Sequence, residues 1–451
     1  MPISTSASNP TPEHDASSSI LPQNRLFFTA LVMTCGGVLF GLRSLASDSP
    51  HVPVWITVAG WAGTLLGTLV IILGHKVRFT PFRFRILRNF AILLAFGSIV
   101  VFAVRVSFGL SHTRLLSCSD DSAITVWEGG AFVRNGHNPY LTWNNPRELL
   151  TKCHVVTFTL LQTGRFARDF IQPSPQHVTP ITTDILEGIT PPEVLSAYFY
   201  PIGNALLGVF GSPMIIIITA FTAILLSGLI LARTPQQLRG MLALTMAAQV
   251  PFWGQFGVLN AAPFAFVLLL PAWFSPSSKS SSLTAGFACA VRQLPWLSIP
   301  ALAGLVWRQN GFRKGVRTGA LIVLVFLAIS LPFMWNIPGK WFHDVISQEM
   351  FAIPNGSGLV VLFSSRILPA VLAKYLSVLE VCTTLLAGVL ALIFGRNHPE
   401  VAAVCTGLAI WVGPVSYAAH IAPVGMFAVL AYWGSQIREN RAHNLTKLQG
   451  Q

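Results

Sequence analysis

The chain has 451 residues, of which 53% are hydrophobic and 10% are charged, and its formal net charge is +13. Soluble globular proteins carry about 25% charged residues, so this composition leaves too little polar surface for a set of soluble domains. The positive charge does not indicate nucleic-acid binding, because the basic residues lie in short segments between apolar runs, as in proteins that orient themselves in a membrane.

The first part of the chain predicts a polar tail followed by three membrane spans. Residues 1–25 are rich in Ser, Pro and Thr and are expected to form a disordered cytoplasmic tail. Apolar runs follow at 26–42, 54–73 and 90–110, close to the roughly 20 residues that a spanning helix needs. The loop before the third run is strongly basic, which favours the cytoplasmic side: it carries Lys76, Arg78, Arg83, Arg85 and Arg88. The third span should therefore emerge on the outer face near Ser111.

A long segment at 111–197 follows, and it holds eight of the 16 acidic residues of the chain. A connection of this length without membrane character is usually functional, because lids and binding loops concentrate in such segments. We therefore expect the active region in this extracytoplasmic loop.

The rest of the chain predicts further helices of uneven length. A short apolar piece at 198–211 is followed by a span at 213–232 and by runs of about 12 to 15 residues between 239 and 317, which are short for full spans. Broken helices at membrane depth are tolerated where they line protein or a water-filled cavity. A span at 318–334, an outer loop at 336–358, apolar pieces at 359–372, 376–394, 401–417 and 421–433, and a basic cytoplasmic tail at 436–451 complete the chain. The predicted fold is all-α and polytopic: one domain at 26–435 with roughly ten to thirteen transmembrane or re-entrant helices.

Two adjacent carboxylates, Asp120 and Asp121, lie just beyond the predicted outer end of the third span. Neighbouring acids repel each other and raise each other's pKa, which suits a general base or a metal ligand. A solvated acidic loop is the alternative interpretation. The GHNPY turn that follows would fold the loop back toward the membrane.

At this point the sequence resembles a known family. The run SDDSAITVWEGGAFVRNGHNPYLTWNNP is similar to the first-loop signature of the GT-C superfamily, whose bacterial mannosyltransferase-like members use polyprenyl-phosphate sugars. The pattern DD, W-[DE]-G and G-x-N-P-Y is matched in order by Asp120, Asp121, Trp127, Glu128, Gly129, Gly136, Asn138, Pro139 and Tyr140.

Weaker similarities extend from about 110 to 433. They match the family at Tyr200, Pro201, Gly254, Gln255, Asn260, Arg292, Pro295 and His420. The chain departs from the family where Ile202 replaces a second proline, and where Ile124 or Thr125 and Gly130 stand in place of arginines.

The resemblance implies an inverting glycosyltransferase. Asp121 would take the proton of the acceptor hydroxyl, with Asp120 as partner or metal ligand, and Arg292 would contact the lipid phosphate. The expected substrate-binding residues are Glu128, Asn138, Tyr140, Tyr200, Gln255, Asn260, Arg292 and His420. Mg²⁺ or Mn²⁺ at Asp120 and Asp121 is a metal to consider, because related enzymes differ in metal use.

Each of these residues also has an ordinary structural interpretation. Arg292 would serve equally as a snorkelling residue at a helix end, and Gln255 and Asn260 as hydrogen-bonding groups between helices. His420 fits a buried core position, and Glu128 a brace within the loop. Cys118 and Cys153 share the outer loop, where a disulfide is chemically permitted.

Three functions compete on this sequence. The expected partners of a transferase are the lipid bilayer, a polyprenyl-phosphate sugar donor carrying mannose, another hexose or a pentose, and a glycan or glycolipid acceptor, with no nucleic acid. The expected location is a bacterial cytoplasmic (inner) membrane with the active site on its outer face. A secondary transporter or flippase would also explain broken helices and an intramembrane arginine, although the predicted core helices hold one acid, Glu380. A non-catalytic scaffold is the third reading.

Overall fold

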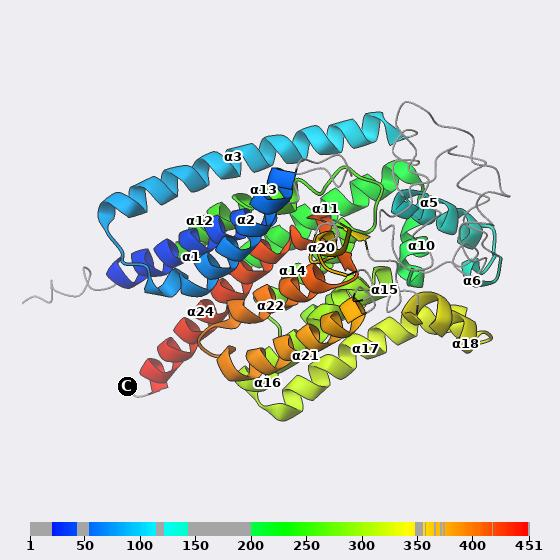
Figure 1. The fold of residues 1–451 in the computed structure, drawn as a ribbon. Coiled ribbons are helices and arrows are strands. Elements are labelled where there is room, and N and C mark those ends of the chain that lie inside the picture. Colours follow the sequence, from blue (N-terminus) through cyan, green and yellow to red (C-terminus); the bar gives the residue numbers. More distant parts are fainter. Residues whose placement is uncertain are drawn as a thin grey trace, which may run out of the picture.

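A computed structural model describes residues 20–42, 54–113, 121–142, 200–347, 355–356, 358–364, 367–369, 372, 375–416 and 418–449. These residues form a bundle of helices, seen side by side in Figure 1. Within the described ranges, the one pairing of strands joins two-residue pieces in parallel, β1 (Asn355–Gly356) and β2 (Val415–Ser416). The prediction of an all-α protein is confirmed.

Six of the described helices are long and apolar enough to cross a membrane. They are α1 (Ile20–Gly41), α2 (Val54–Leu73), α3 (Pro81–Ser111), α11 (Ser212–Ala232), α17 (Phe312–Met334) and α21 (Leu376–Phe394). Large apolar side chains of these helices remain exposed, among them Phe96 on α3 at 66% and Phe221 on α11 at 64%. Such a surface suits lipid and not water. The chain is an integral membrane protein.

Shorter helices fill the centre of the bundle. They are α12 (Gln236–Ala247), α13 (Val250–Trp253), α14 (Ala262–Phe274), α15 (Lys279–Val291), the 3-10 turn η4 (Leu294–Ser298), α16 (Ile299–Asn310) and α22 (Pro399–Val412). Prolines begin several of them, because a missing N–H costs nothing in a helix's first turn. Helix α14 is buried along nearly its whole length. The broken helices predicted between 239 and 317 are therefore present.

Several helix boundaries differ from the sequence expectations. Helix α1 begins at Ile20, inside the stretch expected to be a disordered tail, and residues 1–19 lie outside the described part. Helix α3 begins at Pro81, because the Thr80 hydroxyl accepts a hydrogen bond from the Arg83 N–H and caps the helix. Much of the basic loop is therefore the first turns of a helix.

The last part of the chain also differs in its boundaries. Helix α22 ends at Val412, before the Gly413–Pro414 pair, and the short helix α20 (Val360–Ser364) stands where a longer apolar piece was expected. The short helix α23 (Ala418–Ile421) covers the break expected between 401–417 and 421–433. Helix α24 (Val424–Gln449) runs through the sequence expected to be a tail.

One end of the bundle collects the basic connections, and we call it the basic end. Its segments are joined by hydrogen bonds: Arg441 donates to the carbonyl of Arg233, Arg438 donates to the carbonyl of Phe274 and to Gln309, and Gln309 donates to the carbonyl of Gly395. These arginines meet the carboxyl ends of helices α11 and α14, where the helix dipole favours a positive charge. The C-terminus lies at this end (Figure 1).

The opposite end holds short helices, and we call it the loop end. Its elements are α5 (Asp121–Arg134), α6 (Pro139–Thr142), α10 (Ile202–Gly208), α18 (Pro338–Trp341) and the π-helical turn η5 (Phe342–Ser347), all at the right of Figure 1. Helices α3 and α17 lead to it from the basic end. The rest of the predicted outer loop, at 114–120 and 143–199, lies outside the described residues, as do Cys118 and Cys153.

The first and last helices meet in the core. A Cβ added at Gly37 of α1 would lie 2.7 Å from the Cα of Gly425 on α24 and 2.9 Å from Oε1 of Gln249. Two backbones can approach this closely only where neither residue carries a side chain, as is common for helix pairs in membranes. Around this contact the buried residues form one large apolar cluster that runs through α1, α14 and α24.

Candidate functional site

The described part of the DD-to-NPY segment is built from two helices and a tight turn. Gly136, with φ of 77°, ends α5: its N–H donates to the carbonyl of Val133, and the N–H of His137 donates to the carbonyl of Phe132. This is the Schellman arrangement that a left-handed glycine makes at a helix end. The left-handed backbone at this helix end therefore explains why a glycine occupies the first position of the G-x-N-P-Y pattern.

Asn138 begins the next helix. Its Oδ1 accepts a hydrogen bond of 3.1 Å from the N–H of Tyr140, and Pro139 takes the first helical position of α6. The other end of the same amide, Nδ2, donates to the carbonyl of Phe333 at the end of α17, at 2.8 Å. Asn138 thus fixes α6 to the bundle, which places Tyr140 in the interior.

Tyr140 joins this helix to the start of α10. Its side chain is 1% exposed, and its hydroxyl donates a hydrogen bond of 2.8 Å to the carbonyl of Tyr200. Burial raises the pKa of the Tyr140 phenol, so the group stays protonated and remains a donor. The Tyr200 backbone is thereby held in place directly before α10.

The ring of Tyr200 lies against a buried arginine. Arg292, which follows the last residue of α15, is 4% exposed, and its guanidinium carbon lies 4.2 Å from the centre of the Tyr200 ring. Its Nη2 donates to Oδ1 of Asn260 at 3.1 Å. The same oxygen accepts from the N–H of Ala262 and so caps the start of α14. We call Asn138, Tyr140, Tyr200, Asn260 and Arg292 the arginine network.

Both of these contacts of Arg292 are with neutral groups. A cation over an aromatic face gains up to about 2 kcal/mol where water is excluded, and an amide oxygen orients a guanidinium without cancelling its charge. An arginine keeps its proton under all ordinary conditions, and these two contacts orient the guanidinium inside the protein. Such a group suits the binding of an anion, and a phosphate in particular.

Helix α5, which begins at Asp121, packs closely on α10. A Cβ at Gly208 would overlap the carbonyl of Val126, and a Cβ at Gly130 would overlap the backbone of Gly208. Together with the Tyr140 to Tyr200 hydrogen bond, these contacts make the two helices antiparallel. Gly130, which stands where the family that the sequence resembles has an arginine, is therefore required by the close packing of α5 on α10.

Asp121 is the first residue of α5, so it lies at the far end of this helix from Tyr140. Only its backbone is described, and Asp120 lies outside the described residues. A helical rise of about 1.5 Å per residue puts Asp121 roughly 7 Å along the axis from the Gly208 contact at Val126. The described structure therefore links five predicted residues to one another and places Asp121 by its backbone alone, at the start of α5.

The remaining predicted residues occupy other positions. Glu128 is 4% exposed on α5, in the helix that packs against α10. Gln255 donates to the carbonyl of Pro251 in its own turn, at 3.3 Å. His420 is buried on α23, which packs against α1 and α22.

Sequence reasoning missed two residues beside the network. Trp341 and Tyr140 belong to one buried cluster, which also contains Tyr200. Asp344 is 3% exposed, bonds to Lys340 at 2.8 Å and lies close enough to Tyr140 to raise its pKa further. Both come from α18 and η5, whose irregular sequence carries no helical periodicity that would indicate an inward face.

Comparisons with protein-family models, with curated proteins and with solved structures found no match to this chain.

Proposed function

We propose that this membrane protein is a glycosyltransferase that moves a sugar from a polyprenyl-phosphate donor to a glycan or glycolipid acceptor. The observation that carries the proposal is the arginine network. Its five residues were each expected from the family resemblance, and a chain of contacts connects them: Asn138 bonds to Tyr140, Tyr140 to the backbone of Tyr200, and Tyr200 and Asn260 both contact Arg292. If each residue only formed a separate hydrogen bond between helices, these five would not be expected to contact one another.

The proposed reaction inverts the anomeric carbon. The acceptor hydroxyl loses its proton to Asp121 and attacks that carbon, while the bond from the carbon to the phosphate oxygen breaks on the opposite face. The electron pair of the broken bond stays on the lipid phosphate. Arg292 stabilises this added negative charge, and Tyr200 and Asn260 hold its guanidinium in position.

The proposal also assigns the surroundings of the reaction. Glu128, Gln255 and His420 remain the proposed sugar-binding residues, and the outer face of a bacterial cytoplasmic membrane remains the proposed location of the site. Carboxylate oxygens are the ligands that Mg²⁺ and Mn²⁺ favour, so Asp120 and Asp121 are the residues that would hold such an ion.

The test is transfer by the purified protein in lipid vesicles, supplied with radiolabelled polyprenyl-phosphate mannose and a glycolipid acceptor pool, with and without Mg²⁺ or Mn²⁺. Wild type is compared with Asp121→Asn and with Asp169→Asn, which makes the same chemical change elsewhere in the predicted outer loop. Loss of a positioned general base should lower transfer by roughly 10²- to 10⁴-fold. Asp169→Asn should transfer like wild type.

Two results would count against the proposal. Equal transfer by wild type and Asp121→Asn would remove this carboxylate from the chemistry. Label that enters the vesicle lumen or changes leaflet, without being joined to an acceptor, would replace the transferase with the transporter or flippase.

A further inference from the structure

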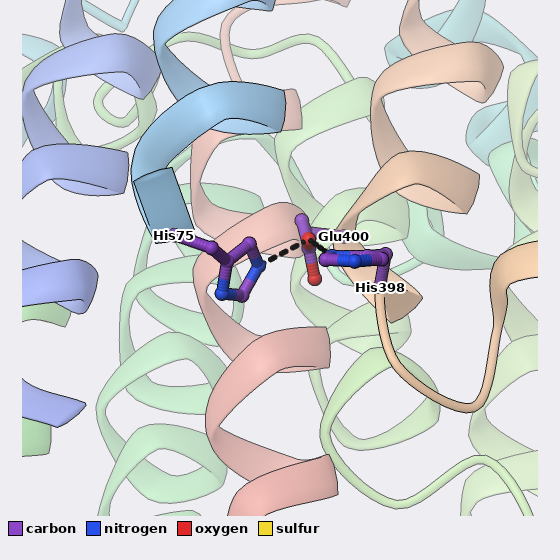
Figure 2. Close-up of side chains that lie close together, drawn as sticks. All are labelled: His75, His398 and Glu400. Carbon is purple, nitrogen blue, oxygen red and sulfur yellow. Dashed lines mark hydrogen bonds and ion pairs between the residues drawn. The ribbon is translucent and has the colours of Figure 1, made fainter. Parts of the chain in front are cut away.

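A second group of ionisable residues lies at the basic end, far from the arginine network. His75, in the 3-10 turn η2 (Gly74–Lys76) after α2, faces Glu400 in the first turn of α22. His398, directly before α22, faces the same carboxylate. Figure 2 shows both imidazole rings directed at one oxygen of Glu400 from opposite sides.

The contacts within this group are short. His75 Nε2 lies 2.7 Å from Glu400 Oε1, and His398 Nδ1 lies 3.2 Å from the same oxygen. The three candidate ligand atoms all lie within 4.8 Å of one another. The two histidine rings meet edge to face at 4.6 Å, and His75 also contacts the ring of Tyr432 on α24.

The carboxylate of this group is fully buried, whereas its two histidines are partly exposed. The side chain of Glu400 is 0% exposed, whereas those of His75 and His398 are 24% and 41% exposed. Its second oxygen, Oε2, has no hydrogen-bond partner in the described structure. A carboxylate oxygen buried without a partner is costly, and a bound cation is one way in which proteins offset that cost.

We propose that His75, His398 and Glu400 bind a divalent transition-metal ion, with zinc as the ion that the ligand set fits best. Two imidazole nitrogens and one carboxylate oxygen form a donor set that zinc accepts, with a fourth position left to water. This inference concerns the basic end and does not depend on the proposed transferase activity.

The two distances from the histidine nitrogens to Glu400 need little adjustment to accept the ion, and the two nitrogens, which lie within 4.8 Å of each other, must stand about 3.3 Å apart once it is bound. Zinc bonds of about 2.0 to 2.1 Å in a tetrahedron place the ligand atoms about 3.3 Å apart. The His398 to Glu400 distance of 3.2 Å already has this value, and the His75 to Glu400 distance of 2.7 Å must open slightly. The partial exposure of both histidines gives the ion a route to the site from solvent.

Binding would replace the two hydrogen bonds by two metal bonds, and the proton on each coordinating nitrogen would move to the other nitrogen of a neutral ring or to solvent from an imidazolium. The ion would then join the α2–α3 connection to the α21–α22 connection. These segments lie more than 300 positions apart in the chain. Their connection through one ion would fix the relative position of the two halves of the bundle at this end.

The experiment measures zinc in the full-length protein, purified in detergent through a tag that contains no histidine. The protein is loaded with Zn²⁺, passed through a desalting column with a weak chelator and analysed by mass spectrometry for metals. Wild type is compared with His75→Gln, His398→Gln and Glu400→Gln. The control is His112→Gln, which removes a histidine at the loop end of α3.

Wild type and His112→Gln should retain about one zinc ion per chain, and each of the three site variants should lose most of it. Replacement of zinc by Co²⁺ should give the visible absorption of a tetrahedral cobalt site in wild type and in the control only. Because His398 is well exposed, His398→Gln tests the proposal even if Glu400→Gln does not fold. Equal zinc content in wild type and His398→Gln, or no retained zinc in wild type, would overturn the proposal.

Discussion

The two ends of the bundle bury charges of opposite sign. At the loop end a cation, Arg292, is buried, and its guanidinium contacts Tyr200 and Asn260. At the basic end, where Lys76 and Arg396 are close in sequence to the site, an anion, Glu400, is buried and held by two imidazoles. Each end therefore buries a side chain whose charge is opposite to that of the nearby sequence, which is rich in acids at the loop end and in basic residues at the basic end.

This difference has a chemical meaning. A buried guanidinium with planar, forked donors selects a phosphate, whereas a buried carboxylate with two imidazoles selects a metal cation. The two proposed sites, one at each end of the bundle, therefore differ in chemistry. Substitutions at one end should leave the properties of the other unchanged, because residues far apart without shared partners act independently.

Among the substitutions that compare the two ends of the bundle, Arg292→Gln should have the largest effect. Removing one charged group that stabilises the leaving phosphate should lower transfer by roughly 10²- to 10³-fold. Zinc content at the basic end should stay the same as in wild type. The matched control is Arg134→Gln, an exposed arginine in the last turn of α5, which should transfer normally. Normal transfer by Arg292→Gln would break the assignment of the phosphate to this end.

Gly208→Ala should have the next largest effect, because the new Cβ would overlap the carbonyl of Val126 and force α5 away from α10. Overpacking of this kind costs about 1 to 3 kcal/mol, seen as a lower thermal midpoint in detergent. Gly228→Ala on α11 is the control, since no atom lies within 4 Å of its added Cβ. If both variants melt together with wild type, the α5–α10 contact does not position the loop end.

Tyr140→Phe removes one hydroxyl and leaves the carbonyl of Tyr200 without its 2.8 Å hydrogen bond. An unsatisfied buried group of this kind costs about 1 to 2 kcal/mol. Transfer should fall only modestly, because the Tyr200 ring keeps its contact with Arg292. A loss of transfer as large as that of Arg292→Gln would mean that the hydroxyl itself contacts the substrate.

Lys340→Gln should have the smallest effect. The Lys340 side chain is 46% exposed, so its 2.8 Å pair with Asp344 is screened by water and contributes at most about 1 kcal/mol. The thermal midpoint of wild type and variant, measured at low and high salt, should differ little. A large, salt-independent loss would show that this pair is shielded from solvent and belongs to the buried part of the loop end.

The helical architecture could be predicted from the sequence because lipid imposes a single rule. A run of about 20 apolar residues must satisfy its backbone hydrogen bonds internally, so its composition alone defines a helix. The starts of α3 and α17 could not be located in this way. Arg83 and Arg313 each lie in a first turn that extends beyond the apolar run into a basic segment, and no hydropathy rule distinguishes such a turn from a loop.

The two candidate sites also differ in whether the sequence alone could indicate their residues. Tyr140, Tyr200 and Arg292 were found through motifs, because each lies in a segment with an unusual local pattern. His75 and Glu400 carry no such pattern, being single residues at the ends of different helices that become neighbours only through the packing of α2, α22 and α24. Contacts of this range depend on the complete fold, and spacing along the chain does not reveal them.

The contact between Gly37 and Gly425 can form only late in the synthesis of the chain. Helix α1 leaves the ribosome about 390 residues before the partner that completes its packing, which at 5 to 20 residues per second is a delay of roughly 20 to 80 s. During that interval α2 can already cover one face of α1, since these helices pack together early in the chain. The face that carries Gly37 can contact Gln249 earlier, but its packing stays incomplete until α24 is made, and membrane chaperones and proteases can act on it during that time. A nascent chain that stops before α24 should therefore be removed by quality control, although it would contain both the arginine network and His75 with Glu400.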